Sequence, residues 1–368
     1  MLSPGPLDLR SLNRATLARQ LLLGRARMPA LGAVEQLAGL QAQLARPPFV
    51  ALWSRLQGFG RDELSAAVQG KKAVRAPFFR HTIHLVSARD YLAFRGVVQA
   101  ALDRMAATHL RKVKVDQAVV LAEARALLAA EPRTFGELKA ELARRHPKED
   151  AQSLAFVPRT HLPLVQRPGD GPWSYPPDAE LSLADAWLGK KHQADGDGAR
   201  EALALRYLAA FGPANAADLR EWSGVPEWKP VLDRLRPRLL ALRTEDGREL
   251  LDLPDAPRPG GDVKAPVRFL PDFDNLLLGH ADRTRVMPPS AKPAFAAKNG
   301  MVPGAVLVDG FVSATWRAAT KGRVAALTVK PLAKLTRTQR AELEAEGDAL
   351  LAFLDPETGT REVRVEGA

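Results

Sequence analysis

The feature that most constrains this fold is a helical segment followed by a β-rich segment, a pattern that occurs three times along the chain. In its first occurrence, apolar residues at helical spacing predict helices over residues 11–27 and 32–45, and Pro47 and Pro48 would end the second. Short helices at 49–57 and 61–68 follow. Residues 73–86 are then β-branched and aromatic with partial alternation, which predicts a hairpin, and residues 88–110 return to a helical pattern.

Helices that lead into a hairpin are typical of a winged helix. Residues 115–145 predict a helix, a turn and a second helix, and we interpret the proline- and glycine-rich segment 154–175 as the wing. From residue 199, a helix, the Gly212–Pro213 break and a short helix precede a further helix at 231–242 and a hairpin at Asp246–Gly247. Repetition at a spacing of roughly 80 to 100 residues indicates tandem duplication.

The end of the chain has a different pattern. Residues 254–265 have the composition of a linker, and Asp309–Gly310 is the turn signal of a hairpin. A strand, a helix at 336–353 and a closing strand at 361–365 follow. We therefore expect an α+β protein with winged-helix units at 1–114, 115–198 and 199–262, and a small β-rich domain with one helix at 263–368.

Charge favours a polyanionic partner. Lys and Arg number 53 against 42 Asp and Glu, which gives a formal net charge of +11 and an isoelectric point of about 10.1. Nucleic acid is the commonest polyanion that such a protein binds. The alternative is that an Arg- and Ala-rich composition simply reflects a GC-rich genome.

Several classes of site are excluded or disfavoured. The absence of cysteine excludes disulfides, thiolate metal sites and cysteine nucleophiles. The seven histidines form no closely spaced pair on a predicted helix, so we expect neither a metal nor another cofactor. The chain has no apolar leader and no apolar run of about eighteen residues, which predicts a cytoplasmic protein without a membrane partner. No dimerisation helix is evident, so we expect a monomer.

The first candidate site is Gln41–Ala42–Gln43, placed by the pattern at the end of the second helix, just before Pro47. Residues two apart in a regular helix point about 200° apart, so both amides would face one ligand only if the helix frays there. The alternative interpretation is a solvated helix end, because a short motif on its own is a weak signal.

The second candidate is a basic stretch that contains the first hairpin. Between residues 71 and 114 there are ten Lys or Arg and only two Asp. In a strand, Thr82 and His84 would share a face and could both reach a phosphate or sugar, although a solvated hairpin would show the same alternation. The candidate DNA-binding residues of this stretch are Lys71, Lys72, Arg75, Arg80, Thr82 and His84.

A third candidate is the acidic pair Asp272 and Asp274, which is followed by Arg283. Two nearby carboxylates can perform acid–base chemistry. The alternative, which we favour, is a capping and salt-bridge cluster that ties the third unit to the β-rich domain.

Taken in order, five segments resemble the AlkZ/YcaQ family of bacterial DNA glycosylases. They are RQLLLGRAR, LAGLQAQLARPPFVALWSRL, VRAPFFRHTIHLVSARDY, FLPDFDNLLLGHADR and VLVDGFVSATWR. The resemblance covers nearly the whole chain. It implies three tandem winged helices and a C-terminal β domain that form a C-shaped clamp on duplex DNA, with a hairpin, here Phe78–Leu85, against the DNA.

The resemblance also implies an activity. Members of this family excise N-alkylated purines, and some unhook interstrand crosslinks. Their signature is Gln–apolar–Gln in one branch, which Gln41 and Gln43 match. We expect Gln43 to position water and Gln41 to assist in hydrolysing the N-glycosidic bond of N7-alkylguanine or N3-alkyladenine, without a cofactor. The alternative is a non-catalytic winged-helix protein, such as a transcription factor or nucleoid protein.

Overall fold

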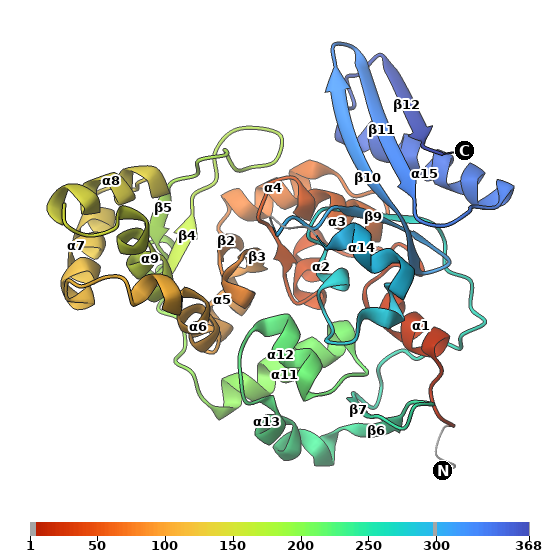
Figure 1. Cartoon of the computed structure of the whole chain (residues 1–368), viewed down its shortest axis with the longest axis horizontal. Coiled ribbons are helices and arrows are strands. Elements are labelled where there is room, and N and C mark those ends of the chain that lie inside the picture. The colour runs from red at the N-terminus through yellow and green to blue at the C-terminus, as the bar shows by residue number, and fades with distance from the viewer. Residues whose placement is uncertain (1–4, 297–299, 368) are drawn as a thin grey trace.

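The computed structural model describes residues 5–296 and 300–367, and these residues form an α+β fold, as expected (Figure 1). A central part contains the first sheet. Helices α7–α9 form a lobe at one end of the long axis, and a second sheet with one long helix lies at the other end (Figure 1). No helix within the described residues has both the length and the apolar character that a membrane span needs.

The first sheet is built around the predicted hairpin. Its strands run in the order β1-β3-β2-β4-β5. Their bounds are β1 Leu40–Gln41, β2 Ala73–Pro77, β3 Ile83–Ser87, β4 Leu164–Gln166 and β5 Leu181–Leu183. The helices of this part are α1 Leu9–Arg19, α2 Ala30–Gln36, α3 Pro47–Arg55, α4 Arg61–Gln69, α5 Ala88–Phe94 and α6 Gln99–Leu110. The hairpin of β2 and β3 is confirmed, with the short helix η1 Phe79–His81 at its turn.

The second predicted helix is shorter than its sequence pattern suggests. It ends at Gln36, and Ala38 and Gly39 then take positive φ angles of 55° and 87°. A Cβ at Gly39 would lie 2.7 Å from Val86 Cγ1, so only glycine lets the chain approach β3 this closely. Pro47 and Pro48 begin α3 instead of ending a helix, because proline suits the first helical turn.

The lobe comprises α7 Gln117–Ala130, α8 Phe135–Arg145 and α9 Ala151–His161. The first two match the predicted helix–turn–helix, and Thr134 with Glu137 forms a capping box on α8. The wing predicted for 154–175 is wrong in part. Residues up to His161 are helical, since Leu154 and Val157 pack in the core of the lobe. Strand β4 then pairs with β2 and so extends the first sheet.

The third part has the predicted helices and hairpin, but the helix predicted for 231–242 is wrong in part, because it ends at Leu235 and residues 240–243 form a strand. It contains α10 Ala184–Leu188, α11 Asp197–Phe211, α12 Ala216–Ser223 and α13 Trp228–Leu235, then η2 Arg236–Arg238 and the strands β6 Leu240–Arg243 and β7 Glu249–Asp252. Its core is continuous with that of the hairpin, because Tyr207 and Trp222 cluster with Phe78 and Phe79. The third part therefore packs against the turn of the first hairpin and stabilises it.

The second sheet is at the C-terminal end of the chain. Its strands run in the order β12-β11-β10-β9-β8, with the bounds β8 Arg268–Leu270, β9 Gly304–Val308, β10 Phe311–Lys321, β11 Val324–Pro331 and β12 Thr360–Val365. Asp309 and Gly310 form the predicted turn with φ angles of 47° and 82°. Helix α15, Arg337–Leu354, packs on one face, as predicted. The intervening short helices are η3 Asn275–Leu277, η4 Arg283–Arg285, η5 Pro289–Ala291 and α14 Lys292–Phe295.

Candidate active site

Gln41 ends strand β1 and Gln43 lies in the bend that follows it, so neither residue is on a helix. Strand β1 pairs antiparallel with β3, with Gln41 opposite His84, and the Ala42 amide donates to the Ile83 carbonyl at 2.7 Å. Both amide oxygens accept from the β2–β3 hairpin, Gln41 Oε1 from Arg80 and Gln43 Oε1 from the Ile83 amide. The helical geometry that would have pointed the two amides about 200° apart does not apply, because the second helix ends at Gln36, before the motif.

Gln41 is buried, with 6% of its surface exposed, and its amide is fixed. The Arg80 guanidinium donates to Gln41 Oε1 at 2.7 Å and also to the Trp222 carbonyl. It lies 3.3 Å from Asn275 Oδ1, and Asn275 Nδ2 donates to the Gly39 carbonyl at 3.2 Å. One network of hydrogen bonds thus joins the motif to α12 and to η3.

Gln43, by contrast, is exposed. The Ile83 amide donates to Gln43 Oε1 at 3.3 Å, so the side chain takes the place of a strand partner. The Arg75 guanidinium donates to the carbonyls of Ala42 and Gln43 at 2.8 and 3.2 Å. The backbone of the motif is held from both sides, and only the Gln43 amide reaches solvent.

The hairpin residues expected on DNA have different environments. Arg75 and His84 are buried, and burial lowers the pKa of Arg75. Burial, followed by the charge of Arg80, lowers the pKa of His84 to about 3. Burial also lowers the pKa of Arg80 to about 10. Arg75 and His84 therefore do not face solvent in this structure, and Arg80 is partly exposed but donates to Gln41 and Trp222. Contact of these three residues with phosphates stays a prediction.

Thr82, Lys71 and Lys72 remain near the surface. The Thr82 hydroxyl donates to the Phe79 carbonyl at 3.0 Å and is partly buried. Lys71 and Lys72 are exposed, and Lys71 Nζ lies 4.3 Å from the centre of the Trp187 ring. These two lysines are the predicted contacts whose side chains are exposed among the described residues.

The acidic candidates are engaged with other groups. Asp274 forms a buried ion pair with Arg55 at 2.9 Å and caps η3 through the Leu276 amide. Asp272 accepts from the Gly304 amide at 3.0 Å and lies 3.7 Å from Arg46, while burial raises its pKa. Asp274 thus links to α3 of the first part, whereas Arg283 binds Glu221 of α12 at 2.8 Å. No three His, Asp or Glu side chains in the described part of the chain gather where they could hold a metal ion.

Sequence reasoning missed Asn275 and the Trp222 carbonyl. Asn275 stands beside the acidic pair, but no local pattern shows that it bonds to Gly39 and Arg80. The backbone gives one further sign: Arg80 and His81 have φ angles of 54° and 60°, which non-glycine residues adopt rarely. Such strain persists where the surroundings hold it, and here Arg80 is held by the amide of Gln41.

Comparison with known proteins gives the family of the chain and a structure with a similar fold. The family model described as DNA glycosylase AlkZ-like matches residues 34–353, which include the motif, the first sheet and every strand of the second sheet except β12. The structure of Streptomyces sahachiroi DNA glycosylase AlkZ is similar over 98% of this chain and 100% of that chain, with a TM-score of 0.78 and 19% sequence identity. No curated protein matches the chain. Since the family model spans most of the sequence, the chain belongs to the AlkZ-like family of DNA glycosylases.

Proposed function

We propose that this protein hydrolyses the N-glycosidic bond of cationic N-alkylated purines in duplex DNA, such as N7-alkylguanine and N3-alkyladenine. The exposed Gln43 positions the attacking water, and the buried Gln41 assists it. The observation that carries the proposal is the contrast between the two amides: one is fixed by Arg80 inside the protein, and the other reaches solvent beside it.

The substrate class follows from the chemistry of an amide. A glutamine side chain does not titrate near neutral pH, so it cannot act as a general base. An alkylated purine already carries a positive charge and leaves with its bonding electrons as a neutral base. Water then adds to C1′ of the oxocarbenium-like sugar and gives its proton to solvent. The enzyme has to orient water and favour the developing charge, which a fixed dipole can do.

The hydrogen bonds of Gln43 suit this role. Its Oε1 accepts one amide hydrogen, from Ile83, and a carbonyl oxygen has a second lone pair with which to hold water. The backbone under Gln43 is held by Arg75. The water would therefore be aimed by a side chain whose attachment does not move, which is what proximity catalysis needs.

The same step would act on an interstrand crosslink between two alkylated purines. Each linked base carries the same cationic leaving group, so cleavage of one N-glycosidic bond would unhook one strand. A linked base cannot leave the helix fully, and such a substrate would need an open, polar site. The exposure of Gln43 is compatible with an open site.

The experiment is release of free base from an oligonucleotide that carries N7-methylguanine, measured in a single turnover with protein in excess. We expect the natural chain to release the base and Gln43→Ala to be at least about a hundredfold slower, with nearly unchanged duplex affinity. Gln69→Ala is the matched control, because Gln69 is an exposed glutamine on α4. Duplex binding by the natural chain without base release would favour the non-catalytic alternative, and a parallel loss of affinity and activity in Gln43→Ala would reject the assigned role.

A further inference from the structure

Arg159, near the end of α9, is a half-buried cation without an anionic partner. Its guanidinium carbon lies 5.7 Å from the centre of the Phe135 ring and 5.6 Å from that of Phe156. Within residues 5–296 and 300–367 its side chain forms no hydrogen bond or ion pair. Burial alone lowers its pKa, with no nearby acid to oppose the shift. Buried charges are normally paired, so this arrangement is costly in the free protein.

Each of the other arginines whose pKa burial lowers has at least one hydrogen-bond or ion-pair partner among the described residues. Arg80 and Arg285 donate to backbone carbonyls, and Arg268 lies 3.5 Å from Glu346. Arg61, Arg75 and Arg95 likewise donate to carbonyl oxygens. Arg159 is therefore an exception among similar side chains in the described part of the chain, and this points to a partner outside the protein.

The surroundings of Arg159 are positive and contain unpartnered polar atoms. The ring of His109 stacks on Phe156 at 4.0 Å, and the ring of His81 lies 5.7 Å from it. Burial, then the charges of Arg159 and Arg95, lower the pKa of His81 to about 4. Asp103 does not compensate for Arg159, because it accepts from Gln99 at 2.6 Å and lies 3.4 Å from His161.

This cluster is next to the candidate active site. His81 belongs to the turn of the β2–β3 hairpin, two residues before Ile83, whose amide binds Gln43. The Phe156 ring lies 5.7 Å from the His81 ring of that turn, and the Arg159 guanidinium lies against Phe156. Both residues belong to α9, in the lobe at the end of the molecule (Figure 1). An anion held by Arg159 would thus lie close to the strand that positions Gln43.

We propose that Arg159 binds one backbone phosphate of DNA, close to the nucleotide whose base is removed. A guanidinium is suited to phosphate because it can donate two parallel hydrogen bonds. The phosphate would supply the anionic partner that Arg159 does not have in the free protein. The contact would also place the α7–α9 lobe on the same DNA as the motif. The position beside the lesion rests on the proposed function, whereas the phosphate contact itself can be tested on undamaged DNA.

The test replaces single phosphates of a duplex by uncharged methylphosphonates and measures the affinity of each duplex for the natural chain and for Arg159→Met. Methionine keeps the contact with the two aromatic rings but removes the charge. We expect one linkage at which a methylphosphonate weakens binding of the natural chain about tenfold. The same methylphosphonate should leave binding of Arg159→Met unchanged. The log–log salt slope of Arg159→Met should be shallower by about one unit on unmodified DNA.

Arg144→Ala is the matched control, because Arg144 is an exposed arginine of the same lobe that pairs with Glu141. It removes one charge without touching the cluster, and its methylphosphonate profile should equal that of the natural chain. The proposal is overturned if Arg159→Met keeps the natural salt slope, or if it remains sensitive to the same linkage. A phosphate contact without any base release would retain this proposal and reject the proposed function.

Discussion

Arg75 and Arg80 show how a basic residue beside the candidate site can be engaged by groups of the protein itself. A guanidinium offers five donors, so one buried arginine can satisfy several oxygen atoms that would otherwise be unpaired. Arg80 donates to the Gln41 side chain and to the Trp222 carbonyl, and Arg75 donates to the carbonyls of Ala42 and Gln43. The positive charge near the motif thus serves in part to fix amide and carbonyl dipoles, in an enzyme whose proposed mechanism depends on fixed dipoles.

The buried histidines of the hairpin make stability depend on pH. The pKa values of His81 and His84 fall to about 4 and about 3, mainly because of burial. Both titrate near 6.5 in an unfolded chain. The native state therefore binds fewer protons below that pH. The contribution of these two histidines to the free energy of unfolding is complete above about pH 6.5. It decreases as the pH falls toward their pKa values in the native state.

We expect the Tm of the natural chain to fall between about pH 7 and about pH 5, and that of His84→Gln to fall less over the same interval. The variant should start lower at neutral pH, because the edge-on contact of His84 with Phe79 is lost. Thermal melts at matched ionic strength measure both. An equal fall in the two proteins would show that His84 is not a source of the pH dependence.

Individual elements were predictable wherever a local signal fixes them. The Asp309–Gly310 turn needs two positive φ angles, and the Asp-Gly sequence predicts them. The capping boxes of α8, α12 and α15 mark helix starts in the same way. The end of α2 was not predictable from apolar spacing, because Gly39 is required there by its close approach to Val86, a residue far along the chain.

The candidate site shows the same limit. The glutamines themselves were found from sequence through a resemblance, but their environment depends on long-range contacts. Gln41 meets Arg80 because β1 pairs with β3, and Arg80 meets Trp222 because α12 packs against η1. A residue pattern within one segment contains no information about those partners, and the hairpin arginines were accordingly assigned to DNA.

The C-terminal end of α12 offers a test of this support. Gly224 has a φ of 76°, and a Cβ there would lie 3.2 Å from Arg80 Cα and 3.3 Å from its nitrogen. We expect Gly224→Ala to displace the hairpin turn. The variant should have a lower Tm, and its rate of base release should fall by about tenfold or more. Melting curves and single-turnover base release measure the two effects.

Gly189→Ala is the control for that variant. Gly189 ends α10 with a φ of 68°, but nothing lies within 4 Å of the added Cβ. It should lose about 1 kcal/mol of stability through backbone strain alone and keep its rate of base release. If both variants lose the same stability and keep the same rate, the contact between α12 and Arg80 does not support the motif.

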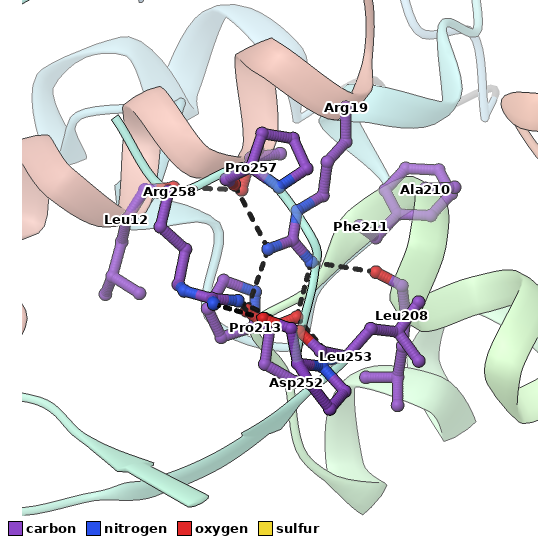
Figure 2. A network of polar contacts seen from close by, with 12 residues as sticks. Leu12, Arg19, Leu208, Ala210, Phe211, Pro213, Asp252, Leu253, Pro257 and Arg258 are labelled. Carbon is purple, nitrogen blue, oxygen red and sulfur yellow. Dashed lines mark hydrogen bonds and ion pairs between the residues drawn. The ribbon is translucent and has the colours of Figure 1, made fainter. Parts of the chain in front are cut away.

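At the scale of the whole molecule, a buried ion pair joins the N-terminal helix α1 to strand β7 of the third part. Arg19 of α1 forms two hydrogen bonds with Asp252 at the end of β7, at 2.6 and 2.8 Å, and a third with the Leu208 carbonyl of α11 (Figure 2). Arg258 of the linker shares Asp252 at 2.8 Å. One carboxylate therefore holds two cations, and its loss leaves more charge uncompensated than the loss of either arginine.

We expect Asp252→Asn to lower the free energy of unfolding by about 3 kcal/mol or more, because it leaves Arg19 buried without a counter-charge. Arg19→Met should cost less, since Asp252 keeps Arg258 as a partner. Urea unfolding followed by circular dichroism gives both values. Equal losses in the two variants would mean that Arg258 does not compensate for the missing guanidinium.

The electrostatic attachment of the whole molecule to DNA should come from exposed cations and not from the buried hairpin arginines. Lys72 is exposed, and within the described residues its side chain forms no ion pair, so it can neutralise a phosphate. Replacing it by Ala should make the log–log salt slope for an undamaged duplex shallower by about one unit. Arg75→Ala should leave the slope unchanged and lower Tm, because Arg75 binds the carbonyls of Ala42 and Gln43.

Affinities at several salt concentrations separate these effects. Lys229→Ala is the matched control, since Lys229 is an exposed lysine of α13 that pairs with Asp233 at 2.7 Å. It removes the same charge, and its slope should equal that of the natural chain, because salt screens charges that do not touch a phosphate. A shallower slope for Arg75→Ala would mean that this guanidinium leaves the motif when DNA binds. An unchanged slope for Lys72→Ala would move the DNA-binding surface away from the start of the hairpin.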